Sequence, residues 1–347
     1  MRKNDGRSPI ELEAEFYSKR FYLSYSGLNK LLYAPQLFYK HYILQQREER
    51  IDTHLVEGKV IHCLLLNDGS FDDLFIVSPS SLPSGNTRLV INKVYQLFTE
   101  KLDKSLCKLD DQRASILQVL KEINLHQSLT DDKKDPGKTG DDKRVEKIVS
   151  DETRSYWEFL LKKGSKDLID EDTYKRCQES VEVLRNNQAV MSLLGIDQTE
   201  ESIKVWNEVP LEMEDPNIPE FGLKGILDNV KADHKLKILY INDLKTSSKT
   251  LSEFRESIEY YKYWIQAAIY LRLIKNFLKD QLTEEWSIVF NFIVIDKYQQ
   301  VYAFPVSSST MEEWQKQLDN KLTEARWHYE NRSYTLPYEF LREQIYL

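Results

Sequence analysis

The sequence predicts an α/β fold with a central mixed β-sheet flanked by helices, joined to a largely helical N-terminal and inserted region. Two observations predict it. Beyond residue 200, apolar residues form the short alternating or continuous runs typical of strands, in the order strand–strand–strand–helix–strand–strand. Ahead of residue 200, apolar residues recur mostly at the three- and four-residue spacing of helices.

The first elements are predicted to be helices. Residues 24–46 carry leucines at helical spacing and are interrupted by Pro35, which separates two helices; Ser24 or Ser26 caps the first. Residues 55–68 form a short apolar helix that contains His62. Residues 71–79 read as a strand or an extended segment.

A helical middle segment follows, with helices expected over residues 88–124, 156–161 and 174–194. Residues 130–144 have no apolar side chain and contain one proline and two glycines, so they predict an exposed loop. Their mixture of acids and bases favours a solvated loop over a phosphate-binding role. The G-K-T triplet within them lacks the spacing of a nucleotide-binding P-loop.

The predicted sheet has five strands, over residues 202–213, 222–233, 235–246, 286–296 and 300–306. The D-H-K-L turn between the second and the third predicts an antiparallel hairpin. The apolar run of the third strand is typical of a central, buried strand. A long helix over residues 251–279 and a final helix around residues 311–326 complete the pattern.

A chain of 347 residues suits one large domain or a core domain with a substantial insertion. We expect residues 1–87 to be the N-terminal helical part of the main domain, residues 88–200 a helical insertion, and residues 201–347 the α/β core. With 41% hydrophobic and 30% charged residues, the chain can bury a core and keep a solvated surface.

Composition also excludes several classes of protein. No apolar run is long enough to span a bilayer and the N-terminus lacks an apolar signal segment, so a cytoplasmic protein without membrane association is expected. Cys63, Cys107 and Cys177 are too few and too far apart for a disulfide framework or an iron–sulfur cluster, and Cys63 is expected in the core. The net charge of −8 argues against a general nucleic-acid coat protein, but not against an enzyme with a confined positive groove.

Polar residues within the predicted strands carry the chemistry. Strand geometry places Asp243 and Lys245 on one face, with the backbone carbonyl of Leu244 between them. Asp228, fifteen positions ahead of Asp243, lies near it if the hairpin forms. Two converging carboxylates are costly to bury unless a cation such as Mg²⁺ joins them. A D-x-K triplet alone is more often a surface ion pair, but both aspartates follow apolar residues, which favours the metal site.

The helix predicted next adds two polar side chains. Gln266 and Tyr270 are four positions apart and therefore share a helix face. Packing alone explains Tyr263 and Tyr270. Gln266, however, lies among apolar residues and requires a polar partner.

These segments resemble the PD-(D/E)XK nuclease superfamily. The runs K-G-I-L-D-N-V, I-N-D-L-K-T-S and Q-A-A-I-Y are similar to the Asp, the D/E-x-K strand and the Q-x-x-x-Y helix of its RecB-like branch. Leu227 stands where the namesake proline of the superfamily would be. Five residues match the motif positions: Asp228, Asp243, Lys245, Gln266 and Tyr270.

Upstream segments extend the resemblance. The G-x-x-x-H helix of the RecB-like branch is matched by Gly58 and His62. The run L-S-Y-S-G-L-N-K-L-L-Y-A-P-Q-L-F-Y is similar to the RecE-type exonuclease (exonuclease VIII) family and its phage relatives. The similarity covers the chain up to about residue 80 and from roughly residue 200 to 305.

The resemblance implies a metal site for Mg²⁺ or Mn²⁺. The lack of four cysteines sets the chain apart from relatives with iron–sulfur clusters, so no such cluster is expected. His62, Asp228, Asp243 and the Leu244 carbonyl would hold the ion, although His62 taken alone reads as a core histidine. An acid on the preceding strand is a further candidate ligand. Glu208 occupies that strand, with Glu212 and Glu214 as competitors.

The resemblance also implies roles for the remaining residues. Lys245 would orient or help deprotonate the attacking water, and Gln266 and Tyr270 would position the DNA backbone or support Lys245. The implied activity is a Mg²⁺-dependent DNA nuclease, digesting linear double-stranded DNA from 5′ to 3′ in phage or prophage recombination. The implied setting is the cytoplasm of a bacterial or phage-infected cell.

Partners and alternatives follow from the same resemblance. DNA is the expected substrate, a single-strand annealing protein or recombinase the expected partner, and a homo-oligomer the expected assembly. One alternative is a RecB-like nuclease that trims single strands or cuts internally. Another is a catalytically inactive DNA-binding module with the same fold.

Overall fold

The computed structural model describes residues 8–46, 53–79, 81–99, 108–131, 137–164, 166–196, 198–214, 220–283 and 285–342. The chain forms two compact units. Unit 1 comprises Met1–Asp68 and Glu179–Leu347, and unit 2 comprises Gly69–Gln178. The domain division expected from the sequence, at residues 87/88 and 200/201, stays a prediction. None of the described helices has the length and apolar composition of a membrane-spanning segment.

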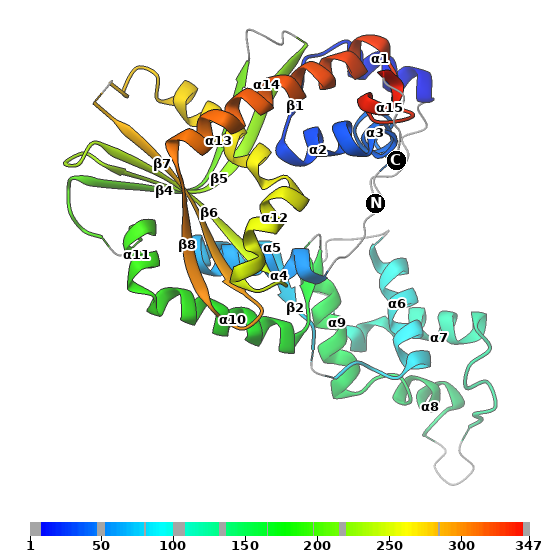
Figure 1. Ribbon diagram of the computed structural model, residues 1–347. Coiled ribbons are helices and arrows are strands. Elements are labelled where there is room, and N and C mark those ends of the chain that lie inside the picture. The colour runs from blue at the N-terminus through cyan, green and yellow to red at the C-terminus, as the bar shows by residue number, and fades with distance from the viewer. Residues whose placement is uncertain are drawn as a thin grey trace. The chain divides into compact units, whose positions relative to one another are not determined.

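Unit 1 contains a six-stranded mixed sheet, which confirms the predicted fold class (Figure 1). Its strands are β1 (Phe21–Leu23), β4 (Ile203–Glu214), β5 (Phe221–Asp233), β6 (Ile238–Ser247), β7 (Ser287–Asp296) and β8 (Val301–Val306). The pair β5–β6 is antiparallel, as the turn predicts, β6–β7 is parallel and β7–β8 is antiparallel. All five predicted strands are therefore present. The unpredicted β1 is too short to show a strand period.

One edge of β5 is shared by two partners. Strand β4 occupies the other edge over most of its length, from Asp233 back to Gly222. On the shared edge, β6 pairs with residues 229–233 and β1 with residues 221–223. Residues 224–228 therefore have no strand beside them on this edge among the described residues. The strands β5 and β6 part at this point, and we call the opening between them the fork.

A row of asparagines crosses the sheet immediately beside the fork. Asn207, Asn229, Asn242 and Asn291 are register partners on four consecutive strands. Each neighbouring pair shares a side-chain hydrogen bond of 2.7–2.9 Å. The side-chain amides of the first three also donate to helix carbonyls, namely those of Leu66, Leu194 and Leu193. Three of the four, Asn229, Asn242 and Asn291, are buried, and these hydrogen bonds fix the register of the four strands.

Unit 1 also contains most of the helices. They are α1 (Pro9–Tyr17), α2 (Tyr25–Tyr33), α3 (Pro35–Phe38), a π-helix (Tyr39–Ile43), α4 (Thr53–Leu66), α11 (Gln188–Leu194), α12 (Phe254–Tyr261), α13 (Tyr263–Phe277), α14 (Ser308–Asn331) and α15 (Tyr338–Arg342). Helix α13 packs against β4, β5 and α14, and α14 reaches α2 (Figure 1). Helix α4 packs against β5 and β6.

The predicted N-terminal helices are confirmed. Ser24 caps α2, because its hydroxyl accepts a hydrogen bond from the Gly27 N–H. Pro35 begins α3 and so separates the two helices. Cys63 is buried, as expected. Cys107 lies outside the described residues.

The predicted helix over residues 251–279 is wrong in one respect, because the segment is not continuous. A 3₁₀ turn over Leu251–Glu253 precedes α12, and Lys262 separates α12 from α13. Lys262 has a left-handed backbone with φ of 60°, which ends the helix. No glycine or proline marks this position, so apolar periodicity alone predicted one helix. The predicted final helix is present and longer, as α14.

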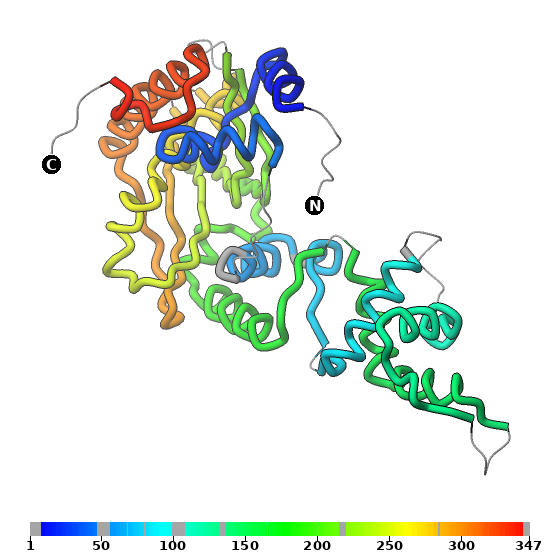
Figure 2. Tube along the Cα trace, turned by 90° about the vertical axis from the view of Figure 1, so that its right-hand side faces the viewer, coloured from blue at the N-terminus to red at the C-terminus, as the bar shows by residue number. Residues whose placement is uncertain are grey.

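Unit 2 is mainly helical. Its elements are α5 (Phe71–Leu74), β2 (Phe75–Val77), α6 (Gly85–Thr99), α7 (Arg113–Glu122), α8 (Gly140–Glu146), α9 (Asp151–Lys163) and β3 (Asp167–Ile169). Helices α6 to α9 gather in one group (Figure 2) around a core that includes Ile91, Val119 and Trp157. Helix α10 (Glu171–Asn186) begins in unit 2 and ends in unit 1, and Asn187 then caps α11, so the predicted helix over residues 174–194 is in fact two. Residues 100–107 of the helix predicted over 88–124 lie outside the described residues.

The loop predicted over residues 130–144 is wrong for its second half. Thr139 and Asp142 form a capping box that starts α8. The charged composition concealed this T-x-x-D cap in the sequence. Residues 132–136 of the predicted loop lie outside the described residues.

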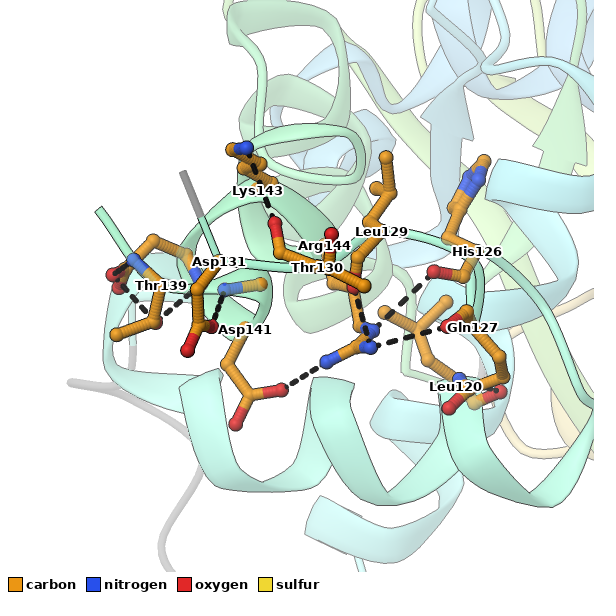
Figure 3. Close-up of polar contacts among 12 residues, drawn as sticks. Leu120, His126, Gln127, Leu129, Thr130, Asp131, Thr139, Asp141, Lys143 and Arg144 are labelled. Carbon is orange, nitrogen blue, oxygen red and sulfur yellow. Dashed lines mark hydrogen bonds and ion pairs between the residues drawn. The ribbon is translucent and has the colours of Figure 1, made fainter. Parts of the chain in front are cut away.

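Arg144 of α8 holds the preceding chain in place (Figure 3). Its guanidinium donates to the carbonyls of His126, Gln127 and Leu129 at 2.7–3.3 Å and pairs with Asp141. One arginine thus satisfies three backbone acceptors of a segment without regular structure.

Candidate active site

The site lies in the fork, one residue beyond the asparagine row. Asp228 and Asp243 are the first residues of β5 and β6 after their pairing ends. The N–H of Leu244 donates to Asp228 Oδ2 at 2.8 Å and so bridges the two parting strands. Asp228 is 8% exposed and Asp243 is 0% exposed. The structure therefore brings together the two aspartates singled out in the sequence.

Glu208 reaches the same site through an irregular backbone. The β4–β5 ladder pairs Asn207 with Asn229 and Val209 with Leu227, and skips Glu208. The φ angle of Glu208 is 51°, a left-handed value that is unfavourable for a residue with a Cβ atom. Ligand atoms of Glu208, His62 and Asp228 all lie within 4.8 Å of one another.

The two competing acids lie elsewhere on β4. Glu214 forms an ion pair with Arg20, and its side chain is mostly exposed. Glu212 pairs in register with Lys224 and is also exposed. Of the three candidates, the structure brings only Glu208 to the aspartates.

His62 is carried to the site by α4. A Cβ atom at Gly58, one turn earlier, would lie 3.2 Å from Thr246 Oγ1 of β6. The missing side chain thus allows α4 to approach β6 closely. His62 Nε2 lies 2.9 Å from the Leu244 carbonyl oxygen, and Nδ1 lies 3.6 Å from Asp228 Oδ2 and 3.9 Å from Glu208 Oε1.

His62 is neutral and directs a nitrogen lone pair into the site. Burial, assisted by the charge of Lys245, lowers the pKa of His62 to about 4, so the ring is neutral at neutral pH. A carbonyl oxygen can only accept, so the Nε2 atom facing Leu244 carries the proton. The Nδ1 lone pair then faces two carboxylates. A cation among these three groups would turn their mutual repulsion into attraction.

The carboxyl groups show the same deficit of positive charge. Burial raises the pKa of Asp228 and of Asp243 to about 6, although Lys245 opposes both shifts. Burial and the charge of Asp228 raise the pKa of Glu208 to about 7. The three carboxyl groups are therefore harder to ionise in the metal-free site. A divalent cation among them would stabilise their ionised, carboxylate form.

Lys245 neutralises Asp243 only in part. Its Nζ lies 2.6 Å from Asp243 Oδ2. Beyond this ion pair, neither carboxylate oxygen of Asp243 has a hydrogen-bond partner among the described residues. Burial alone would lower the pKa of Lys245, but Asp243 and Asp228 outweigh it and raise the pKa. The residues present therefore fit a hard divalent cation such as Mg²⁺ or Mn²⁺, which takes carboxylate, carbonyl and imidazole ligands.

Gln266 and Tyr270 are hydrogen-bond partners of each other. Gln266 Nε2 donates to the Tyr270 hydroxyl at 2.9 Å, and both side chains are buried. Burial, with the charges of Asp243 and Asp228, raises the pKa of Tyr270 well above 10, so the phenol stays protonated. A Cβ atom at Gly225 would lie 2.7 Å from the Tyr270 ring, so this glycine allows α13 to pack against the stretch of β5 that borders the fork.

The structure adds two aromatic residues to the site. Lys245 Nζ lies 4.9 Å from the ring centroid of Tyr263, which the sequence explained by packing alone. The ring centroid of Tyr25 lies 6.4 Å from that of Tyr263. Tyr25 was not among the candidate site residues predicted from the sequence. A signal for Tyr263 was present in the sequence, because it lies three residues before Gln266 and seven before Tyr270 and so shares their helix face. Tyr25 lies within the run L-S-Y-S-G that resembles the RecE-type family, but that run did not single it out as a site residue.

One family of known proteins matches most of the chain. The model of the PD-(D/E)XK nuclease superfamily matches residues 22–335. No curated protein matches the chain. Among solved structures, the chain is similar to a protein from Eubacterium rectale provisionally named as an exonuclease, with 11% identity over 100% of this chain and 95% of that chain and a TM-score of 0.47.

Proposed function

This chain belongs to the PD-(D/E)XK nuclease superfamily, and from that membership we propose that it is a metal-dependent deoxyribonuclease that hydrolyses phosphodiester bonds. One observation carries the proposal. His62, Glu208 and Asp228 converge within 4.8 Å, beside a buried aspartate for which Lys245 is the one partner among the residues that the structure describes. Burying such a set of polar groups costs free energy unless the groups bind a cation and a phosphate.

Each residue has a proposed role. Asp228, Asp243, Glu208, the Nδ1 atom of His62 and the Leu244 carbonyl would hold Mg²⁺ or Mn²⁺. When bound, such an ion polarises a phosphate oxygen and lowers the pKa of water. Leu244 serves the site twice, because its N–H orients Asp228 and its carbonyl accepts from His62, which fixes the imidazole tautomer.

Lys245 supplies positive charge for the reaction. Because its pKa is raised, it stays protonated at neutral pH in the metal-free site. A protonated ammonium orients an attacking water and stabilises the charge that develops on the phosphate, but it does not act as a base. The buried Gln266–Tyr270 pair would support this part of the site through α13, or contact the DNA backbone.

The substrate proposed from the resemblance is linear double-stranded DNA, digested from 5′ to 3′ in phage or prophage recombination. A single-strand annealing protein or a recombinase would take over the remaining strand, and a homo-oligomer would fit such a role. A RecB-like single-strand exonuclease or an endonuclease is the first alternative. The inactive DNA-binding module is the second.

Cleavage of labelled DNA tests the proposal. The purified chain should degrade linear duplex DNA with Mg²⁺ or Mn²⁺ and stop with EDTA, and Asp243→Ala or Lys245→Ala should lower turnover strongly. Lys237→Ala is the matched control, because Lys237 lies in the β5–β6 turn at the opposite end of β6. Wild-type rates in the Asp243 and Lys245 variants would refute the assignment.

Further substrates separate the alternatives. Comparison of 5′- and 3′-labelled ends gives the polarity, and a covalently closed circle that is cut indicates an endonuclease. Calorimetry with Mn²⁺ addresses the inactive module, for which no binding is expected.

A further inference from the structure

Three tyrosines lead outward from Lys245, and we call them the tyrosine track: Tyr263, Tyr261 and Tyr260. The ring of Tyr263 is partly buried, whereas Tyr261 is 42% exposed and Tyr260 is 74% exposed. Tyr261 stacks on Tyr263 with ring centroids 5.4 Å apart and 26° between the ring planes. Tyr260 meets Tyr261 edge-on at 4.9 Å. The aromatic surface is thus continuous from the buried lysine to solvent.

The three tyrosines lie at the junction of α12 and α13, two helices that Figure 1 labels. Tyr260 and Tyr261 are the last residues of α12, and Tyr263 is the first of α13. The carbonyl of Tyr261 accepts a hydrogen bond from the Tyr25 hydroxyl and another from Asn29 Nδ2 at 3.5 Å. Residues of α2 therefore hold the break in place, so the rings are pre-organised and little entropy is lost when a ligand stacks on them.

Charge along the track is mixed. Lys245 Nζ lies 4.9 Å from the Tyr263 ring centroid, and Lys249 Nζ lies 5.8 Å from that of Tyr260. Helix α12 also carries Glu256 and Glu259. The track therefore has a cation near each end without forming a broad basic surface. Recognition here would depend on flat aromatic faces more than on net charge.

We propose that the tyrosine track stacks unpaired bases of the DNA strand whose backbone reaches Lys245. Exposed aromatic rings flanked by lysines are the chemistry that binds single-stranded nucleic acid, since every base has a face that can stack. Bases within a duplex are already stacked on their neighbours, so only an unpaired segment fits. The inference rests on the proposed nuclease function and narrows its substrate to a strand that is single-stranded where it enters the site.

Binding without cleavage tests the proposal. A fluorescein-labelled oligothymidylate of about twelve nucleotides is titrated with protein in EDTA, and the same is done with an abasic strand of equal length. Tyr260→Ala and Tyr261→Ala should each weaken binding to the oligothymidylate by about 5- to 150-fold and leave binding to the abasic strand unchanged. Tyr261→Trp should retain affinity for the oligothymidylate, because it keeps an aromatic face.

Tyr240→Ala is the matched control. Tyr240 also lies beneath a lysine, with Lys231 Nζ 4.4 Å from its ring centroid. It lies on the same strand as Lys245 but about 16 Å away along β6. Its removal should leave binding to both strands unchanged.

The outcomes separate this proposal from the nuclease function. Equal oligothymidylate affinity of the Tyr260→Ala/Tyr261→Ala double variant and the wild type would overturn the track, even if both proteins cut DNA. An equal loss on the abasic strand would overturn it too, because backbone contact would then explain the loss. Base-dependent binding by a protein that cuts no DNA with any metal would uphold the track and refute the nuclease function.

Discussion

The left-handed backbone at Glu208 can be tested by replacing this residue with glycine and, separately, with alanine. Both substitutions remove the carboxylate, so they differ only in the Cβ atom. At an ordinary strand position, glycine is less stable than alanine by about 0.5–1 kcal/mol, because its unfolded chain has more conformational freedom. At φ of 51°, the Cβ atom of alanine meets the neighbouring backbone at a cost of about 1–2 kcal/mol.

These two contributions oppose each other at Glu208. Their balance makes Glu208→Gly more stable than Glu208→Ala by about 0–1.5 kcal/mol, which reverses or cancels the ordinary order. Glu212 is the internal control, because it is an exposed glutamate on the same strand and has no positive φ. At Glu212, alanine should be the more stable by about 0.5–1 kcal/mol.

The assay is urea unfolding of the four variants in EDTA, with the midpoint compared at constant slope. The glycine-minus-alanine difference at Glu208 should exceed that at Glu212 by about 1–2 kcal/mol. If the two positions give the same difference, the backbone at Glu208 is ordinary. The account of how this carboxylate is directed to the site would then be wrong.

Three further predictions concern the same site. In the metal-free protein the pKa is raised to about 6 for Asp228 and Asp243 and to about 7 for Glu208. These raised pKa values contribute stability that is full below about pH 4 and is lost as the pH rises through them. The lowered pKa of His62 has the opposite effect and offsets part of this stability below pH 6.5. Mn²⁺ should therefore raise the melting temperature more at about pH 8 than at about pH 5, and an equal rise would contradict the assigned ligands. Gly58→Ala should weaken Mn²⁺ binding by about tenfold in calorimetry, and Thr246→Ala in the same chain should restore it, because the added Cβ atom meets Thr246 Oγ1. Tyr270→Phe should destabilise the fold by about 1–3 kcal/mol because Gln266 loses its partner; adding Gln266→Leu should recover much of this, and additive losses in the double-mutant cycle would exclude the coupling.

The strands were predictable because their apolar patterns are long. Strands β4 to β8 each carry enough residues to reveal a period or a buried run, and the turn before β6 carries its own signal. The break at Lys262 was not predictable, because a lysine in a left-handed conformation leaves the apolar spacing of α12 and α13 unchanged. Sequence patterns report regular backbone, and this break is a single irregular residue.

The candidate site was predictable to the same extent. Asp228, Asp243 and Lys245 lie on predicted strands at a recognisable spacing, and the structure places all three in the fork. The sequence could not select Glu208 from three glutamates on one strand. What selects Glu208 is a backbone angle and the gap in the β4–β5 ladder, and neither depends on a residue type that a pattern would reveal.

The asparagine row explains why these irregularities coincide. Asn207, Asn229 and Asn242 each adjoin one of the site acids in the chain, namely Glu208, Asp228 and Asp243. The row is the last position at which β4, β5 and β6 are all in register, and its buried amides are bonded both to each other and to helix carbonyls. A slip of one residue would leave several of these amides unpaired, at about 1–3 kcal/mol each. The row therefore fixes the register of the strands, so the neighbouring residue on each strand can depart from regular pairing without a slip of the register. Those neighbouring residues are the acids of the site.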